Sequence, residues 1–333
     1  MKLPNYSHIY LEEKAKSSHI TNIILSKLPK SKVILIKDYK EIFNRSGQDF
    51  QIQKQSPKLI LANKKDHFLY KGSDLAPDFG EDHFYYNSLV LNCPYNCDYC
   101  YLQGMYSSGN IVIFVNIDDF FQATEEKLQD LGRLYLCLSY DTDLLGMESW
   151  IGYSKLWIEF ARSRPNLILE LRTKSANAKA LEGCKPIENL ILAWTLSPEV
   201  VVTKFEKKTA SLSARIRAMT AAMDIGWKVR ICIDPILDFP GWQDAYIQLV
   251  DTLQESKLLD RVEQISLGTF RMNKDYFARI RKNRKSDSSL FLNEFVTEQG
   301  AVFYPLATRE RLIDHLQENL AIKSNSSIYF RDY

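Results

Sequence analysis

The chain has 333 residues, of which 45% are hydrophobic and 25% charged, and its 43 Lys and Arg against 41 Asp and Glu give a net charge of +2. This composition is ordinary for a globular protein, and the length suffices for one large barrel or two domains. No apolar run approaches the ~18 residues needed to cross a bilayer and the N-terminus lacks a signal peptide's apolar core, so we expect a cytoplasmic protein.

The first 80 residues resemble a small α/β unit. Short β-type apolar runs cover residues 32–37 and 58–62, and a polar stretch separates them. The segment 72–80, which contains Pro77 and begins and ends with glycine, is typical of a linker. We therefore predict a small N-terminal α/β domain over residues 1–80 and a main domain over residues 81–333.

From residue 88 onward, strand-like runs alternate with longer segments that carry helical spacing of apolar residues. The predicted strands are 88–91, 111–116, 133–140, 167–173, 190–196 and 228–236. Such alternation predicts a parallel sheet with right-handed crossovers. Six units make a partial (β/α)6 TIM-type barrel, in which ligands bind at the C-terminal ends of the strands.

Three cysteines, Cys93, Cys97 and Cys100, follow the first of these strands at spacings of four and three residues. Iron–sulfur cubanes are normally held by four thiolates, so a loop with three leaves one iron free for a substrate or cofactor. CxxxCxxC with an aromatic residue before the last cysteine is typical of radical S-adenosylmethionine enzymes.

The alternatives to a cluster are weaker. A structural zinc site would need a fourth ligand, for which His83 is the nearest candidate. A disulfide framework is typical of short secreted domains, and this long chain has only six cysteines. The other three, Cys137, Cys184 and Cys232, are single and widely separated, which is typical of small buried side chains.

Polar residues gather where four predicted strands end. These segments are 139–143, 172–175, 194–197 and 234–235. Any one of these polar segments alone is typical of helix capping. Four of them at strand ends in the domain that carries the cysteine loop indicate a ligand site. Lys174 at the barrel mouth needs an anionic partner, which the carboxylate of S-adenosylmethionine would supply.

The chain resembles the spore photoproduct lyase family from residue 1 to about residue 290. The matching segments are 100–103 (CYLQ), 113–118 (a strand and turn like VNLDE), 142–147 (like SDIVGI), 172–174 (like VTK) and 240–242 (like EGW). The resemblance implies a radical enzyme that repairs a thymine dimer in DNA with a [4Fe-4S] cluster and S-adenosylmethionine. Its electrons would come from a reductant such as flavodoxin or ferredoxin.

The resemblance also assigns residues. Cys93, Cys97 and Cys100 would hold the cluster, and abstraction of hydrogen by a 5′-deoxyadenosyl radical would start the reaction. The cofactor-binding side chains would be those of Thr142, Lys174 and Thr195. Tyr99 and Tyr101 flank the last cysteine, as tyrosines used in radical return do.

Two features depart from the family pattern. Tyr140 stands where the family has its hydrogen-donating cysteine, so we predict that Tyr140 is the donor or lines a pocket for another substrate. Cys137 is a poor substitute because strand alternation would point it to the opposite side. The family's Arg-Tyr hairpin, which helps to flip bases, corresponds to residues 297–304, where no arginine occurs. Phe303 and Tyr304 there are typical of core aromatics.

Three hypotheses remain open at this point. The chain is a lyase for a DNA photolesion, or it applies the same radical chemistry to another substrate. The third hypothesis is a DNA-binding protein with a cluster or zinc and no catalysis, which the retained Thr142 and Lys174 disfavour.

Overall fold

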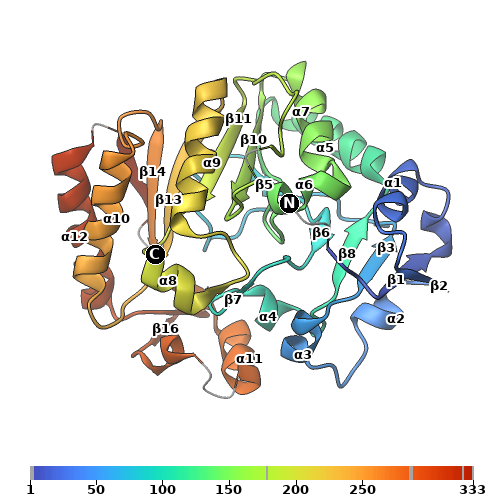
Figure 1. Cartoon of the computed structure of the whole chain (residues 1–333), viewed down its shortest axis with the longest axis horizontal. Helices are drawn as coiled ribbons and strands as arrows, with labels where there is room; N and C mark the ends of the chain where they lie inside the picture. Colours follow the sequence, from blue (N-terminus) through green and yellow to red (C-terminus); the bar gives the residue numbers. More distant parts are fainter. Residues whose placement is uncertain (1–3, 178, 285–287, 325, 332–333) are drawn as a thin grey trace.

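The protein is built on two parallel-rich sheets whose outer faces carry most of the helices (Figure 1). The structure, a computed structural model, describes residues 4–177, 179–284, 288–324 and 326–331. Within these ranges, no helix is both long and apolar enough to cross a membrane.

The first sheet has the strand order β2-β1-β3-β8-β6. Its strands are β1 (His8–Glu12), β2 (Lys32–Ile36), β3 (Leu59–Ala62), β6 (Val90–Leu91) and β8 (Ile111–Phe114). All neighbours are parallel except β6, which runs antiparallel to β8. The sheet therefore joins strands from both sides of residue 80, and the division of the chain at that residue stays a prediction.

The second sheet has the order β18-β14-β13-β11-β10-β9-β5-β4 and is parallel from β5 to β18. Its strands are β4 (Tyr70–Lys71), β5 (Phe84–Tyr86), β9 (Leu134–Cys137), β10 (Leu167–Thr173), β11 (Leu190–Thr195), β13 (Lys228–Ile236), β14 (Gln264–Thr269) and β18 (Ser327–Phe330). This confirms the α/β partial-barrel prediction and its last four strands.

Two of the six predicted barrel strands are placed differently. The runs at 88–91 and 111–116 pair with each other in the first sheet, and β5, which sequence reasoning missed, takes the position between β9 and the edge strand β4. The reason is local: Asn87 to Leu89 separate β5 from β6, so the chain leaves one sheet and enters the other within a few residues.

Helices follow most of the strands and cover the outer faces of the sheets (Figure 1). They are α1 (His19–Lys27), α2 (Lys40–Phe43), α3 (Phe50–Gln55), α4 (Leu102–Met105), α5 (Ile117–Leu131), α6 (Leu144–Ile151), α7 (Tyr153–Arg162), α8 (Glu199–Phe205), α9 (Leu212–Ile225), α10 (Trp242–Glu255), α11 (Lys274–Arg284) and α12 (Leu306–Lys323). Two 3-10 turns cover Glu13–Ala15 and Ser289–Leu292. Local sequence fixes several ends: Ser211 caps α9, and Gly132 at φ 72° ends α5.

Two small antiparallel sheets complete the fold. One pairs β7 (Asn96–Cys97) with β12 (Glu206–Lys207), and the other contains β15 (Arg271–Asn273), β17 (Ala301–Phe303) and β16 (Val296–Glu298). The first of them ties the cysteine loop to the segment that follows α8, which brings Cys97 opposite Glu206.

Candidate active site

The cysteine loop starts at a fixed, buried point. Asn92 directly follows β6 and has φ 70°, a conformation that asparagine tolerates better than most residues. Its side-chain amide donates hydrogen bonds to the carbonyl oxygens of Ser108 (2.7 Å) and Asn110 (2.6 Å). The turn that leads into Cys93 is therefore held by the segment that follows the cysteine loop in the chain.

A second set of contacts fastens the middle of the loop to α11. Arg284 donates hydrogen bonds to Asp98 Oδ1 and to Gln103 Oε1, both at 2.7 Å. Gln103 in turn donates to the carbonyl oxygen of Cys97 at 2.6 Å. The side chain of Arg284 is only 4% exposed, so this arginine belongs to the interior and braces the loop.

The three thiols of the loop are free of disulfides and lie in a largely buried setting. Burial raises the pKa of all three, that of Cys93 to about 12, and the thiols of Cys93 and Cys97 each interact electrostatically with that of Cys100. At neutral pH each thiol stays protonated unless a metal replaces its proton.

Two lysines place positive charge around the thiols. Lys54 Nζ donates to the carbonyl oxygen of Cys93, and its charge lowers the pKa of the Cys93 and Cys100 thiols. Lys174 has the same effect on Cys97 and Cys100. Both lysines therefore oppose burial and favour the thiolate forms.

Three thiols on one short loop are the kind of donors that hold an iron–sulfur cubane, in which each thiolate binds a separate iron. A small pocket beside the loop is lined by Lys54, Cys93 and Cys100. The side-chain oxygens of Asn92 and Asn96, which also line it, are buried without a hydrogen-bond partner.

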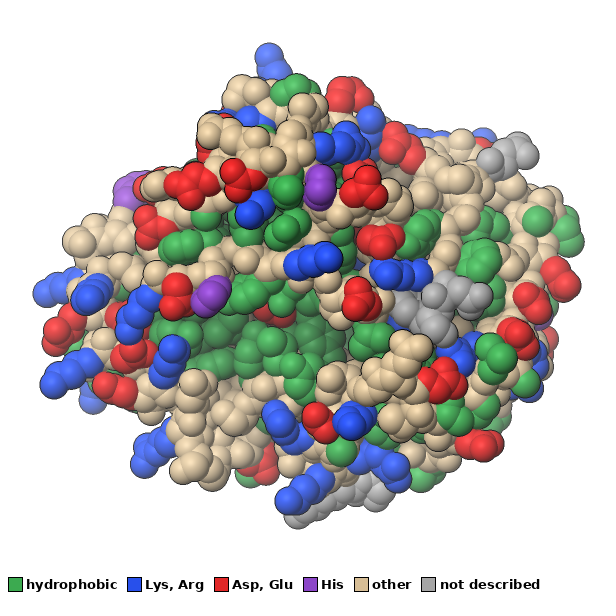
Figure 2. Space-filling model, turned by 180° about the vertical axis from the view of Figure 1, so that it is seen from behind, with side chains coloured by type: hydrophobic (Ala, Val, Ile, Leu, Met, Phe, Trp, Pro, Cys, Tyr) green, Lys and Arg blue, Asp and Glu red, His purple; other side chains and the backbone are tan. Residues whose placement is uncertain are grey.

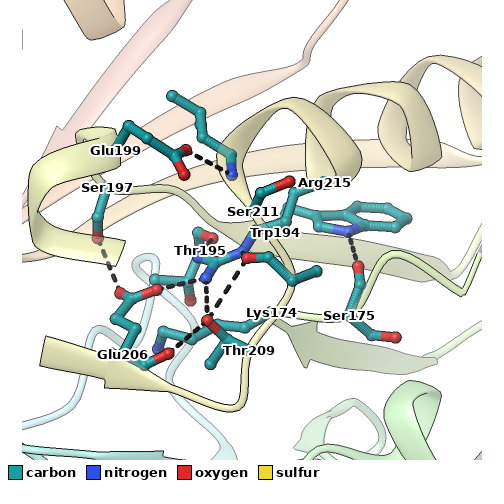
Figure 3. Close-up of polar contacts among 12 residues, drawn as sticks. Lys174, Ser175, Trp194, Thr195, Ser197, Glu199, Glu206, Thr209, Ser211 and Arg215 are labelled. Atoms are coloured by element: carbon teal, nitrogen blue, oxygen red, sulfur yellow. Dashed lines mark hydrogen bonds and ion pairs between the residues drawn. The ribbon is translucent and has the colours of Figure 1, made fainter. Parts of the chain in front are cut away.

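Lys174 extends from the end of β10 toward Glu206, beside the cysteine loop (Figure 3). Its Nζ lies 5.3 Å from the ring centre of Tyr99, whose hydroxyl donates to Glu206 Oε1. Glu206 is also paired with Arg215, and both side chains are fully buried. Burial would raise the pKa of Glu206, but Lys174 and Arg215 hold it below its usual value.

The two predicted threonines occupy different surroundings. Thr195 ends β11 inside the Glu206 group, where its carbonyl oxygen accepts a hydrogen bond from Arg215 at 3.0 Å (Figure 3). Thr142 directs its hydroxyl to the thioether of Met147 at 3.4 Å. Its neighbour Asp143, which caps α6, accepts from the backbone amide of Lys174 at 2.7 Å, so the start of α6 is tied to the end of β10.

Tyr101 and Tyr140 meet on the other side of the loop. The Tyr101 hydroxyl donates to the carbonyl oxygen of Tyr140 at 2.8 Å and to Asp141 Oδ1 at 3.2 Å. Asp141 also accepts from Ser88 and Tyr106. Burial raises the pKa of the Asp141 carboxyl group, and these hydrogen bonds offset only part of that rise. Tyr99 and Tyr101 thus point to different partners.

Tyr140 is one ring in a row of aromatic side chains. Its ring stacks on Tyr86 with centroids 4.0 Å apart, and Tyr86 stacks on Tyr70 at 5.2 Å. The prediction that Cys137 faces away from Tyr140 was wrong: both border one buried cluster that contains Phe84 and Tyr135. Strand β9 ends at Cys137, so side-chain alternation does not continue to Tyr140.

The hairpin at 297–304 has no aromatic side chain available to wedge between bases. Strands β16 and β17 join at Gln299 and Gly300, and Phe303 and Tyr304 are 4% and 1% exposed. The Tyr304 ring stacks on Phe295, and its hydroxyl accepts from the amide of Asp238. Both residues are core aromatics, as the sequence indicated.

The back of the molecule has a broad hollow lined mainly by hydrophobic side chains, and both basic and acidic side chains stand around it (Figure 2).

Sequence reasoning missed Glu206, Arg215, Arg284 and Tyr86. Glu206 lies in a two-residue strand after α8, 107 residues from its partner Tyr99. No local sequence pattern predicts a contact between residues so far apart in the chain. Arg284 follows other basic residues at the end of α11, and nothing in the sequence marks it as the buried one.

A sequence model of the family "Spore photoproduct lyase" matches residues 82–294. Spore photoproduct lyases of a Geobacillus species and of Bacillus subtilis are 26% and 24% identical over 170 and 167 residues. Each match covers about half of this chain and 49% of the relative, so the chain spans about half the length of the curated relatives it matches.

Solved structures extend the likeness to the whole fold. A variant of spore photoproduct lyase with dinucleoside spore photoproduct superposes with a TM-score of 0.84 at 18% identity, and the match covers 99% of this chain and all of the other. Another variant, with bound AdoMet and dinucleoside spore photoproduct, gives 0.80 at 18% identity over the same shares. The family model covers well over half of the sequence and the fold agrees along its length: the chain belongs to the spore photoproduct lyase family.

Proposed function

We propose that this protein is a radical S-adenosylmethionine enzyme that repairs a thymine photolesion in DNA. The observation that carries the proposal is the convergence of three free thiols with Lys174, which extends from a different strand to the same buried place. Cys93, Cys97 and Cys100 would hold a [4Fe-4S] cluster. When bound, the cluster and S-adenosylmethionine supply a radical that can abstract hydrogen.

The protein's own residues position the cofactor. Lys174 offers its ammonium group to the cofactor carboxylate, and that group lies over the Tyr99 ring and close enough to Glu206 to affect its charge. Thr195 at the end of β11 and Thr142 in the loop after β9 offer hydroxyl groups on either side of β10. The surrounding side chains are buried, which keeps water away from a reactive intermediate.

Tyr140 supplies the hydrogen atom that the product takes up in this proposal. Burial raises the pKa of its phenol, so the group keeps its proton at physiological pH. The neighbouring Tyr101 carries the hydrogen relay onward, and its hydroxyl already contacts the Tyr140 carbonyl oxygen and Asp141.

A lesion in DNA is supported by the family membership. The relatives' solved structures hold dinucleoside spore photoproduct, which makes that lesion the first substrate to test. Flavodoxin or ferredoxin in the cytoplasm would deliver the electron.

A second candidate is the same chemistry on a different substrate. Two observations favour it: a tyrosine stands where a thiol is expected, and Phe303 and Tyr304 are too deeply buried to act as a wedge. Binding to duplex DNA across a salt series separates the two, because a protein that contacts phosphates loses affinity steeply as salt rises.

Anaerobic reconstitution with iron and sulfide, followed by dithionite and S-adenosylmethionine, tests the proposal. We expect chromatography to detect 5′-deoxyadenosine. If a bound and reduced cluster yields none, the site is structural and the protein is not a radical enzyme.

A further inference from the structure

Strand β10 divides apolar from charged side chains between its two faces. Leu167, Leu169 and Leu171 belong to the main hydrophobic core beneath the helices. The alternate residues Glu170 and Arg172 point to the barrel interior, as expected for a strand. Their charged groups are thus enclosed by the sheet and need partners there.

The two carboxylates in this interior already have strong partners. Glu170 accepts from Arg230 at 2.7 Å and from Tyr135 at 2.6 Å. Asp234 accepts two hydrogen bonds from Arg271, at 2.8 and 2.9 Å. Each carboxylate therefore has a guanidinium partner other than Arg172.

Arg172 is the third guanidinium beside these two carboxylates. Within the described part of the chain, its one hydrogen bond runs from Nε to Glu170 Oε1 at 3.1 Å, and its Nη1 is 3.8 Å from Asp234 Oδ2. Its side chain is 24% exposed, against 8% for Arg230 and Arg271. The outer nitrogens of Arg172 are thus the donors with unused capacity in this group.

Arg172 and Tyr140 lie around the same inner layer of the barrel. The guanidinium carbon of Arg172 is 5.9 Å from the ring centre of Phe79, and Phe79 and Tyr140 both pack on the cluster that contains Tyr135 and Cys137. Arg172 and Tyr140 also each interact electrostatically with the Cys137 thiol, so the two side chains border the same part of the interior.

We propose that Arg172 binds the phosphodiester group that joins the two nucleosides of the lesion. This inference rests on the proposed function and names the part of the substrate that the protein recognises. Guanidinium is planar and suits a phosphate oxygen pair, and the phosphodiester carries one negative charge. Arg172 is then a specificity-determining residue that selects a dinucleotide over a phosphate-free dinucleoside.

The test measures binding by the reconstituted protein with S-adenosylmethionine but without reductant, so that no turnover occurs. The ligands are spore photoproduct with and without its bridging phosphate. We expect the wild type to bind the phosphate-containing lesion about 10- to 100-fold more tightly, the size of a hydrogen bond to a charged group. Arg172→Met should remove this preference, and Arg172→Lys should restore part of it.

Arg133→Met is the matched control, because that exposed arginine pairs with Glu81 far from the barrel interior. Thermal unfolding of each variant checks the fold. If Arg172→Met weakens both ligands equally, Arg172 has only a structural role and the inference is overturned. If the wild type binds both ligands equally, only the phosphate assignment fails. If it binds neither, the lesion itself is the wrong substrate.

Discussion

The ring of Tyr140 lies almost parallel to that of Tyr86, with centroids 4.0 Å apart and an angle of 18° between the planes. This stacking fixes the orientation of the side chain that we propose as the hydrogen donor. The Tyr140 ring is therefore held in a fixed orientation at the end of a row of stacked aromatic rings. A change to phenylalanine would remove its hydroxyl group and keep the stacked ring.

Tyr140→Phe should leave S-adenosylmethionine cleavage intact but stop the return of hydrogen to the product. The phenyl ring keeps the stacking on Tyr86, so the fold should be retained. Chromatography should detect 5′-deoxyadenosine at near wild-type yield, with by-products in place of repaired thymine. Tyr86→Phe is the control and should repair normally; equal repair by both variants would exclude Tyr140 as the donor.

Arg284→Ala should loosen the cysteine loop. The substitution leaves Asp98 buried without its main ionic partner, and breaking such a pair costs about 3–5 kcal/mol. We expect a lower midpoint in denaturant unfolding and a lower iron content after reconstitution. Lys282→Ala removes an exposed charge from the same helix and should change neither quantity. An unchanged midpoint for Arg284→Ala would mean that α11 does not brace the loop.

Glu148 should make the protein less stable as the pH rises. Burial raises the pKa of its carboxyl group from 4.5 to about 7. Between these values the folded protein keeps a proton that the unfolded chain has lost, so the free energy of unfolding falls with rising pH, by about 3 kcal/mol in all. Above pH 7 this contribution no longer changes.

Urea unfolding at several pH values between 5 and 8 measures this effect. Glu148→Gln keeps an acceptor for the amides of Ser154 and Lys155 but cannot ionise, so its stability should vary less over that range. The same pH dependence in the variant and the wild type would refute the assignment.

The barrel was predictable because its strands are long and apolar, as in 167–173 and 228–236. The prediction of Cys93, Cys97 and Cys100 as metal ligands rests on their spacing, and it stays a prediction. The sequence could not predict that β6 would pair with β8 in the other sheet, because a two-residue strand carries no periodic signal.

The charged pairs inside the site were also beyond sequence reasoning. Tyr99 and Glu206 are joined across 107 residues, and Arg284 and Asp98 across 186. Such contacts depend on how distant elements fold together, and no local pattern encodes them. The prediction for Cys137 failed for a different reason. It assumed that side chains alternate along a strand up to Tyr140, but β9 ends at Cys137.

Cys97→Ala should abolish cluster binding, because two remaining thiolates cannot replace three. The iron and sulfide content and the absorbance of the reconstituted protein measure this directly. Cys184→Ala is the matched control: it removes another free cysteine, one outside the loop, and should bind iron normally. If Cys97→Ala still assembles a full cluster, the ligand assignment is wrong.

The most direct test of the account is repair of dinucleotide spore photoproduct by the reconstituted and reduced wild-type protein with S-adenosylmethionine. The account predicts conversion of the lesion to two intact thymines, with 5′-deoxyadenosine formed only in complete reactions. Formation of 5′-deoxyadenosine with no thymine product, in repeated trials, would contradict the lesion assignment and direct the search to another substrate.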